Sequence, residues 1–333
     1  MSIKEAYCRA HTNIALIKYW GKSDPVNIVP TSSSLSLTLD RFYTDTRVSF
    51  QAQLDQDQFF LNGQEQEKAE RDKISRFLDH FRQLSGVNYR AQVSSYNHVP
   101  TAAGLASSAS AYAALAGACR EALDLDLTDS QLSRFARRGS GSATRSIFGG
   151  FVEWSQGSSP ENSMAIPIDA ANWDIGMVVI AVNKGAKKIS SRQGMAHTLA
   201  TSPFYEEWVK QSRQDLDEIK TAIAQRDFTT VGQIAEANAM RMHATTLAAN
   251  PPFTYFEEET LTAIRAVQDL RAAGYDVYYT IDAGPNVKIL CPASQMTAIE
   301  EALGQYFASE KIISTLPGGP IQILSEWTYD NND

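Results

Sequence analysis

Residues 100–110 form a run of almost exclusively small side chains, which leads into an apolar segment, residues 111–125, that we expect to be helical. Small side chains let a backbone approach a ligand closely, and a helix starting there points free N–H groups and its positive dipole end at that ligand. Ser107, Ser108 and Ser110 add three hydroxyl groups. The run fits a phosphate cradle, but close packing at the start of a buried helix explains the same composition equally well.

The composition indicates a globular protein without general affinity for nucleic acid. The chain has 333 residues, 43% of them hydrophobic, and a net charge of −8, whereas nucleic-acid binding depends on basic surface. No apolar run approaches the roughly 20 residues of a membrane helix, and the first residues have no secretory-signal pattern. The cysteines, Cys8, Cys119 and Cys291, are far apart and lack metal-binding spacing. We therefore expect reduced thiols, a cytoplasmic location and no membrane partner.

Hydrophobic patterning predicts a mixed α/β (α+β) chain in two parts. Strict alternation over residues 34–40 predicts a half-buried strand, and the continuous apolar run 177–182 predicts a buried one. After about residue 185 the pattern changes to long helices, expected at 202–225, 230–247 and 257–273. We expect an N-terminal α/β domain over residues 1–184 and a C-terminal α/β domain over residues 185–333.

A second feature is the segment 10–22, which begins as a buried strand and ends in Tyr19, Trp20, Gly21 and Lys22. The Gly-Lys-Ser sequence is not a P-loop, because the glycine required five positions earlier is a leucine. Lys22 taken alone fits a solvated surface lysine. An adjacent tyrosine and tryptophan near a chain turn, however, favour a pocket or an interface.

A third feature combines Gly139, Ser140, Gly141 and Ser142 with arginines on both sides. The small loop offers backbone N–H groups, and an arginine offers a planar two-pronged donor for phosphate or carboxylate. The end of a helix, capped by glycine and flanked by cations, explains the arginines before the loop. It does not explain Arg145.

Two more segments complete the set. Residues 184–192 are cationic and rich in hydroxyl groups, which fits a phosphate-binding loop and, more commonly, a plain surface loop. Asp282 ends an apolar segment and precedes Gly284 and Pro285, so it is either part of a turn or a rigidly held base. The five histidines form no cluster and receive no role, and neither a Ser/His/Asp arrangement nor a zinc motif appears.

Together these segments resemble the GHMP kinase superfamily and, within it, the diphosphomevalonate decarboxylase family. The matching motifs follow one another over nearly the whole chain, at residues 13–22, 100–110, 138–149, 190–195, 242–246 and 281–288. The departures are small: Thr144 stands where some relatives have other small residues, and Ile281 where methionine is common.

The resemblance implies a GHMP-kinase-like two-domain fold with the active site in the cleft between the domains. It implies an ATP- and Mg²⁺-dependent enzyme of isoprenoid biosynthesis by the mevalonate pathway, which phosphorylates the 3-hydroxyl of mevalonate 5-diphosphate and releases phosphate and CO₂ to give isopentenyl diphosphate. It also implies a homodimer. The alternatives are a mevalonate-type 3-kinase without decarboxylation and a non-catalytic nucleotide-binding homologue.

The resemblance also assigns residues to roles. The expected catalytic residues are Asp282, Arg145 and Lys187. The expected substrate contacts are Tyr19, Lys22, Ser140, Gly141, Ser142, Arg145, Ser191 and Arg192. The expected ATP contacts are Ser94, Asn97, Pro100, Ala103, Gly104, Leu105, Ala106, Ser107, Ser108, Ser110 and Met195. Ser107 is also the expected Mg²⁺ ligand.

Overall fold

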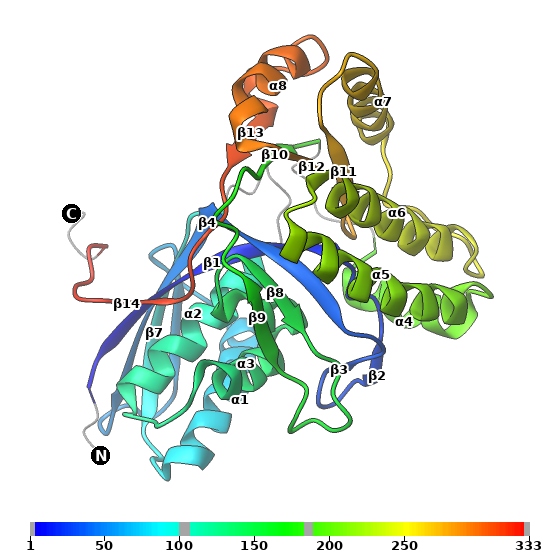
Figure 1. Cartoon of the computed structure of the whole chain (residues 1–333). Coiled ribbons are helices and arrows are strands. Elements are labelled where there is room, and N and C mark those ends of the chain that lie inside the picture. Colours follow the sequence, from blue (N-terminus) through cyan, green and yellow to red (C-terminus); the bar gives the residue numbers. More distant parts are fainter. Residues whose placement is uncertain (1–3, 100–106, 183–188, 330–333) are drawn as a thin grey trace.

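The computed structural model describes residues 4–99, 107–182 and 189–329. Two sheets form its framework, an eight-stranded sheet in the N-terminal half and a four-stranded sheet in the C-terminal half (Figure 1). A separate ribbon pairs β2 (Lys22–Asp24) with β3 (Val29–Pro30). Within the described part of the chain, no helix is long and apolar enough to cross a membrane.

The large sheet is built around two long antiparallel strands, β1 (Ala6–Ile17) and β4 (Ser34–Gln51). The strand expected at residues 34–40 therefore extends further, to Gln51. The first part of β4 pairs with β8 and its second part with β7, on either side of the exposed Asp40 and Arg41. The remaining strands are β5 (Gln58–Leu61), β6 (Gln64–Glu65), β7 (Arg90–Asn97), β8 (Phe151–Trp154), β9 (Ala165–Asp169) and β14 (Gln322–Leu324).

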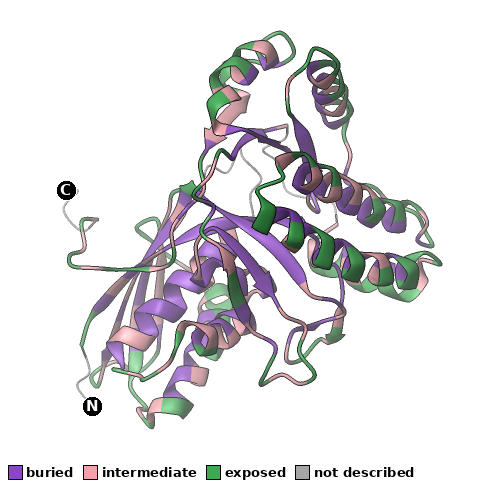
Figure 2. Ribbon diagram, in the orientation of Figure 1, coloured by how far each residue is buried: buried purple, intermediate pink, exposed green. Residues whose placement is uncertain are grey.

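Three helices contact this sheet: α1 (Lys68–Ser85), α2 (Ser107–Ala122) and α3 (Asp129–Gly139). The helix expected over residues 111–125 is α2, which begins earlier and is buried along most of its length (Figure 2). Its small side chains allow it to lie close to β1 and β4, since a side chain at Gly117 would collide with Cys8. A short 3-10 helix, Gly141–Ile147, follows α3 where the sequence suggested a loop.

The second sheet has the order β11-β12-β10-β13. Its strands are β10 (Gly176–Ile180), β11 (Tyr278–Ile281), β12 (Val287–Cys291) and β13 (Ile312–Thr315). Its helices are α4 (Ser191–Thr201), α5 (Tyr205–Gln225), α6 (Phe228–Leu247), α7 (Glu258–Ala272) and α8 (Met296–Leu303), with short 3-10 turns at Ala293–Gln295 and Ser309–Lys311. The buried strand and three long helices expected here are present. Helix α4 was not expected, although Ser190 and Gln193 form a capping box at its start.

The two halves share one hydrophobic core cluster, beside separate clusters of their own. Ile14, Leu16 and Ile17 near the end of β1 pack in the same cluster as Leu216 and Ile219 of α5. The chain also interleaves, because β10 lies in the second sheet whereas β14 returns to pair with β1 in the first. The division into residues 1–184 and 185–333 remains a prediction. By that division, β10 of the first part lies in the second sheet, and β14 of the second part lies in the first sheet. This shared core fixes the end of β1 against the C-terminal sheet.

Candidate active site

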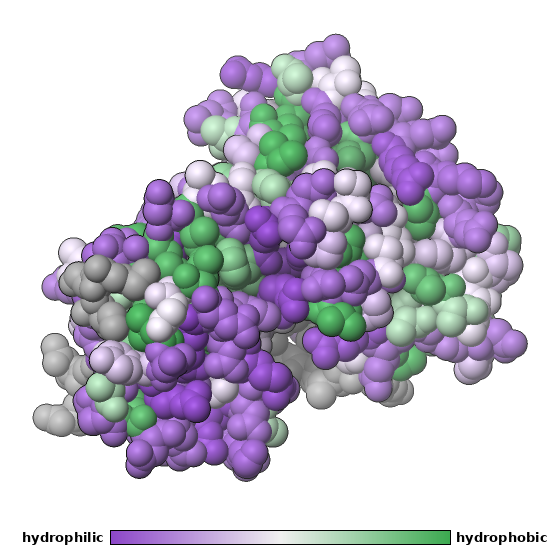
Figure 3. All heavy atoms as spheres, turned by 90° about the horizontal axis from the view of Figure 1, so that it is seen from below, coloured by the Kyte–Doolittle hydropathy of each residue, from purple (hydrophilic) through white to green (hydrophobic). Residues whose placement is uncertain are grey.

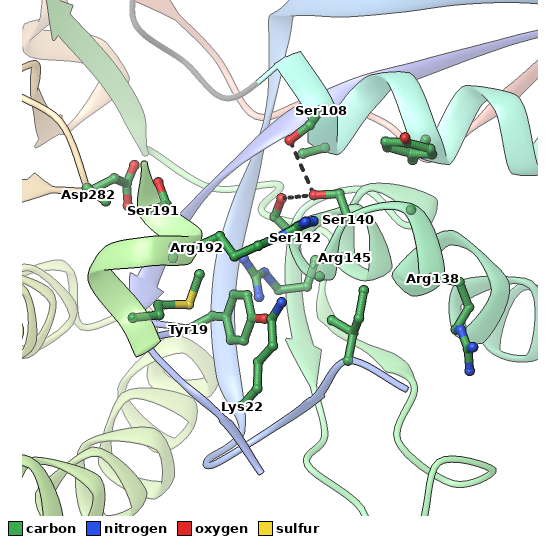
Figure 4. A pocket seen from close by; sticks show the side chains of 18 of the residues that line it. Tyr19, Lys22, Ser108, Arg138, Ser140, Ser142, Arg145, Ser191, Arg192 and Asp282 are labelled. Carbon is green, nitrogen blue, oxygen red and sulfur yellow. Dashed lines mark hydrogen bonds between the residues drawn. The ribbon is translucent and has the colours of Figure 1, made fainter. Parts of the chain in front are cut away.

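A cavity of about 800 Å³ lies where the two halves meet. Hydrophilic side chains predominate on the face that Figure 3 shows, including the junction of the halves. The cavity wall combines the end of β1, the start of α2, the turn after α3, the start of α4 and the loop after β11 (Figure 4). Of the expected site residues, the wall includes Tyr19, Lys22, Ser108, Ser140, Gly141, Ser142, Arg145, Ser191, Arg192, Met195 and Asp282.

Other expected residues lie elsewhere. Pro100, Ala103, Gly104, Leu105, Ala106 and Lys187 fall outside the described residues. Those that are described but do not line the cavity are Ser94, Asn97, Ser107 and Ser110. The hydroxyl of Ser110 is fully buried and lies 2.8 Å from that of Thr44, so this residue ties α2 to the sheet. At Ser110 the packing explanation therefore fits its contacts, and the ATP contact remains a prediction.

Asp282 lies between two buried lysines. Its Oδ1 accepts a hydrogen bond of 2.7 Å from Lys18 Nζ, and its Oδ2 lies 3.3 Å from Lys288 Nζ. The carboxylate keeps 35% of its surface exposed, whereas each lysine side chain keeps 2%. Burial alone would raise the pKa of Asp282, but the two ammonium groups outweigh burial and hold this pKa well below its ordinary value. Asp282 is therefore an ionised carboxylate at neutral pH.

Neither lysine was expected in the site from the sequence. Lys18 directly follows β1 and Lys288 lies inside β12, where all five residues are buried. The position of Lys288 inside an apolar strand could have revealed it in the sequence, since lysine is rarely buried unless it is paired. Burial lowers the pKa of Lys18 to about 8, against the opposing effect of Asp282. Lys18 therefore loses its charge far more easily than an exposed lysine.

Arg145 projects into the cavity from the 3-10 helix after α3. Its Nη1 donates to Ser34 Oγ at 2.6 Å and its Nε to Asn13 Oδ1 at 3.2 Å, and only 2% of the residue is exposed. No carboxylate forms a salt bridge with it among the described residues. Burial lowers the pKa of Arg145 to about 10, while Asp282 opposes this shift. A buried cation without an ionic partner is a costly arrangement, which an anionic ligand would relieve.

A row of hydroxyl groups crosses the floor of the cavity. Ser140 Oγ lies 3.2 Å from Ser108 Oγ at the start of α2 and 3.2 Å from Ser142 Oγ (Figure 4). Tyr19 packs against the next residue, Gly141, where a side chain would collide with the tyrosine ring. The Tyr19 hydroxyl is buried without a partner in the described structure. The floor thus offers donors at the start of a helix, as phosphate sites do.

Cations lie at the mouth of the same cavity. Arg192, in the first turn of α4, is exposed and points toward the row of serines, near Lys22 (Figure 4). Burial and the nearby Arg192 both lower the pKa of Lys22. Arg138, by contrast, points away from the centre and donates to Asn27 at 2.5 Å. Lys22 and Arg192 are therefore placed to meet one anionic group.

The described residues contain no group of three or more histidine, cysteine, aspartate or glutamate side chains that could hold a metal ion. Mg²⁺ in phosphoryl-transfer sites commonly binds through one or two carboxylates and the phosphates of a ligand, rather than through such a group. Ser107, the first residue of α2, can offer a hydroxyl group.

Comparison with known families covers nearly the whole described chain. Residues 10–165 match the diphosphomevalonate decarboxylase-like N-terminal domain, and residues 177–327 match the mevalonate 5-diphosphate decarboxylase C-terminal domain. The chain belongs to the diphosphomevalonate decarboxylase family. The family and the two-domain α/β fold implied by the sequence motifs are thus confirmed.

Members of the diphosphomevalonate decarboxylase family resemble the chain in sequence and structure. The Schizosaccharomyces pombe member is 38% identical and covers 84% of this chain and 77% of its own. The mevalonate diphosphate decarboxylase from Staphylococcus aureus has a TM-score of 0.94 and 48% identity, with 97% of this chain and 98% of that chain covered. MDDEF, solved in complex with MVAPP, AMPPCP and magnesium, has a TM-score of 0.92 and 48% identity, with 97% and 99% covered.

Proposed function

We propose that this protein catalyses the ATP-dependent conversion of mevalonate 5-diphosphate to isopentenyl diphosphate, ADP, phosphate and CO₂. The observation that carries this proposal is the pairing of two opposite features in one cavity. Asp282 is a carboxylate kept ionised by Lys18 and Lys288, and Arg145 is a buried cation without a carboxylate partner among the described residues. Such a site suits a substrate that carries both a reacting hydroxyl and a carboxylate.

The chemistry requires an acceptor for the electron pair released with CO₂. The substrate has no carbonyl group beta to its carboxylate, so its tertiary 3-hydroxyl must first become a phosphate leaving group. The C1–C2 bond then breaks, its electron pair forms the C2–C3 double bond, and phosphate leaves C3. Positive charge develops at C3 during this step, and a fixed carboxylate nearby stabilises it.

We assign Asp282 to the 3-hydroxyl. Its low pKa makes it a weak base, so its main contribution is to accept the hydroxyl hydrogen bond and to face the charge that develops at C3. Arg145 binds the carboxylate through its planar guanidinium group, which Asn13 and Ser34 hold in place. Both groups act by position and charge.

The remaining cavity residues suit the diphosphate and the nucleotide. Tyr19, Lys22, Ser140, Gly141, Ser142, Ser191 and Arg192 would hold the diphosphate. Bound ATP supplies the phosphoryl group, and Mg²⁺ offsets the charge of its phosphates. Ser107 and Ser108 would meet these phosphates at the start of α2. The related MDDEF was solved in complex with AMPPCP and magnesium, which supports a nucleotide and Mg²⁺ as ligands. The roles of Lys187, residues 100–106, Ser94, Asn97 and Met195, the homodimer and the cytoplasmic location remain predictions from the resemblance.

A direct assay tests the function. Purified full-length protein is incubated with mevalonate 5-diphosphate, ATP and Mg²⁺, and CO₂, ADP, phosphate and isopentenyl diphosphate are measured together. We expect equal amounts of all four products. Formation of ADP with a stable 3-phosphorylated product and no CO₂ would instead identify a 3-kinase. Tight ATP binding in calorimetry without turnover would identify a non-catalytic homologue.

Arg192 provides a test of the diphosphate site. We expect Arg192→Ala to raise KM for mevalonate 5-diphosphate by about tenfold to a hundredfold, because a hydrogen bond to a charged group contributes about 1.5–3 kcal/mol. Turnover at saturating substrate should change little, since the diphosphate does not react. Steady-state kinetics measure both constants. Arg265→Ala removes an exposed arginine of α7 outside the cavity and is the matched control. An unchanged KM in Arg192→Ala would remove this residue from the diphosphate site.

A further inference from the structure

Helix α6 contacts β1 and β11, the two strands that lead to the ion pair of Lys18 with Asp282. Lys18 follows β1 and Asp282 follows β11, so the two partners of the ion pair are 264 positions apart in sequence. Figure 1 shows α6 running beside α5 at the junction of the two halves. Two fully buried polar residues of α6, Asn238 and His243, bond to the backbone next to these partners.

Asn238 fixes the backbone of Lys18. Its Oδ1 accepts the Lys18 backbone N–H at 2.9 Å, and its Nδ2 donates to Asp215 Oδ2 at 2.8 Å. Asp215 is itself held by Arg241, with Nη1 within 3.0 Å of both carboxylate oxygens. Because an ionised carboxylate only accepts hydrogen bonds, the amide of Asn238 has one orientation, with its oxygen toward Lys18.

His243 fixes the backbone next to Asp282. Its Nε2 lies 3.2 Å from the carbonyl oxygen of Ile281, the residue immediately before Asp282. Because a carbonyl oxygen only accepts, Nε2 carries the proton. Burial, and to a lesser extent the charge of Lys18, lower the pKa of His243 to about 3 against the opposing effect of the Ile281 carbonyl, so the ring is neutral. Its Nδ1 has no partner within the described structure.

The unpartnered Nδ1 argues against a purely structural role for this histidine. A buried polar atom without a hydrogen bond costs about 1–3 kcal/mol, so an apolar side chain of similar size would pack better here. The ring is already surrounded by aromatic groups, with Phe256 at 4.5 Å and Tyr255 at 6.4 Å between ring centres. What the histidine adds to this apolar site is one donor, aimed at the peptide group that carries Asp282.

We propose that His243, together with Asn238, is a positioning residue that holds the Asp282 carboxylate against Lys18. The proposal rests on the proposed function, because it concerns the geometry of the same reaction. Neither residue needs to touch the substrate. Each one fixes a backbone segment from which a charged side chain extends, and a displacement of about 1 Å at a reacting group can cost about a hundredfold in rate.

Two variants of His243 separate this role from packing. Gln places its amide nitrogen the same number of bonds from Cα as His243 Nε2, whereas Asn places its nitrogen at the level of Nδ1, which is unused. We expect His243→Asn to lower turnover by about tenfold to a hundredfold. His243→Gln should recover most of that loss. The binding constant for mevalonate 5-diphosphate, measured by calorimetry, should stay unchanged in both variants.

Combining variants tests whether His243 acts through Asp282. Adding His243→Asn to Asp282→Asn should cause almost no further loss of turnover, because residues that act as a unit are not additive. Single-turnover CO₂ release from long incubations measures these slow variants. A second full loss in the double variant, or equal losses with Gln and Asn, would overturn the proposal.

Two controls keep the test independent of folding and of the proposed function. CO₂ release by the unaltered protein is measured alongside and tests the proposed function. The relative turnover of the variants tests the role of His243 separately. If His243→Asn does not fold, ¹⁵N NMR of the histidines in the unaltered protein still decides. We expect a neutral ring protonated at Nε2 for His243, and protonation at Nδ1 would contradict the proposed donor to Ile281.

Discussion

We expect Asp282→Asn to lower turnover by about a thousandfold, the upper range for removing one charge-stabilising group from an active site. Asparagine keeps the shape of the side chain but removes the charge that faces C3. The binding constants for ATP and for mevalonate 5-diphosphate should change little, because neither the phosphates nor the carboxylate is assigned to Asp282. Calorimetry gives these constants, and rapid-quench measurement of CO₂ and ADP gives the rates.

The same variant leaves two buried ammonium groups without their carboxylate. The effect of Asp282 raises the pKa of Lys18, so its removal should lower this pKa below about 8 and allow Lys18 to become neutral. The protein can therefore stay folded, which thermal unfolding checks. Asp126→Asn changes an exposed aspartate outside the cavity and is the matched control. Turnover of Asp282→Asn within tenfold of the control would contradict the electrostatic role.

Much of the site could be located from the sequence because turns and helix ends do not account for several of its residues. Asp282 ends a segment more apolar than a surface turn requires, and Arg145 lies beyond the helix end that accounts for Arg137 and Arg138. The structure brings Asp282 and Arg145 to one cavity, although their roles remain proposals. Reasoning from local patterns could identify each unusual residue, and the family motifs then related them to one another.

Lys18, Lys288 and His243 were missed for a physical reason. Each is buried, Lys18 directly after β1 and the other two inside β12 and α6. A single polar residue in an apolar segment usually looks like a local exception to the pattern. Their meaning depends on contacts over long sequence separations, such as the 264 positions between Lys18 and Asp282. Periodicity within a window of about 11–18 residues contains no information about such pairs.

The fold shows the same limit. The buried strand near residue 177 and the long helices of the C-terminal half follow from local patterns, because apolar periodicity directly reflects burial. The placement of β10 and β14 in opposite sheets does not, because the pairing of either strand is decided by the packing of both halves. Helix α4 is an intermediate case. Its capping box was visible in the sequence, but the cations beside it favoured a loop.

The second large effect concerns Arg145. We expect Arg145→Gln to lower kcat/KM for mevalonate 5-diphosphate by about a hundredfold to a thousandfold, because a buried two-pronged contact to the carboxylate is lost. The amide of glutamine can still bond to Ser34 or Asn13. Removing a buried cation that has no carboxylate partner among the described residues also removes its desolvation cost. The thermal unfolding midpoint should therefore stay the same or rise.

Arg82 provides the matched comparison, because it is the same residue type in a buried position with the opposite partners. It forms ion pairs with Asp57 and Asp79, and none of these three residues lines the cavity. Arg82→Gln leaves Asp57 as a buried charge without its partner, so the free energy of unfolding should fall by about 3–5 kcal/mol while kcat/KM of the folded fraction stays unchanged. Opposite responses of stability and activity in the two variants would separate a structural arginine from one reserved for a ligand. A loss of stability in Arg145→Gln as large as that in Arg82→Gln would show that Arg145 is structural, and its assignment to the substrate carboxylate would fail.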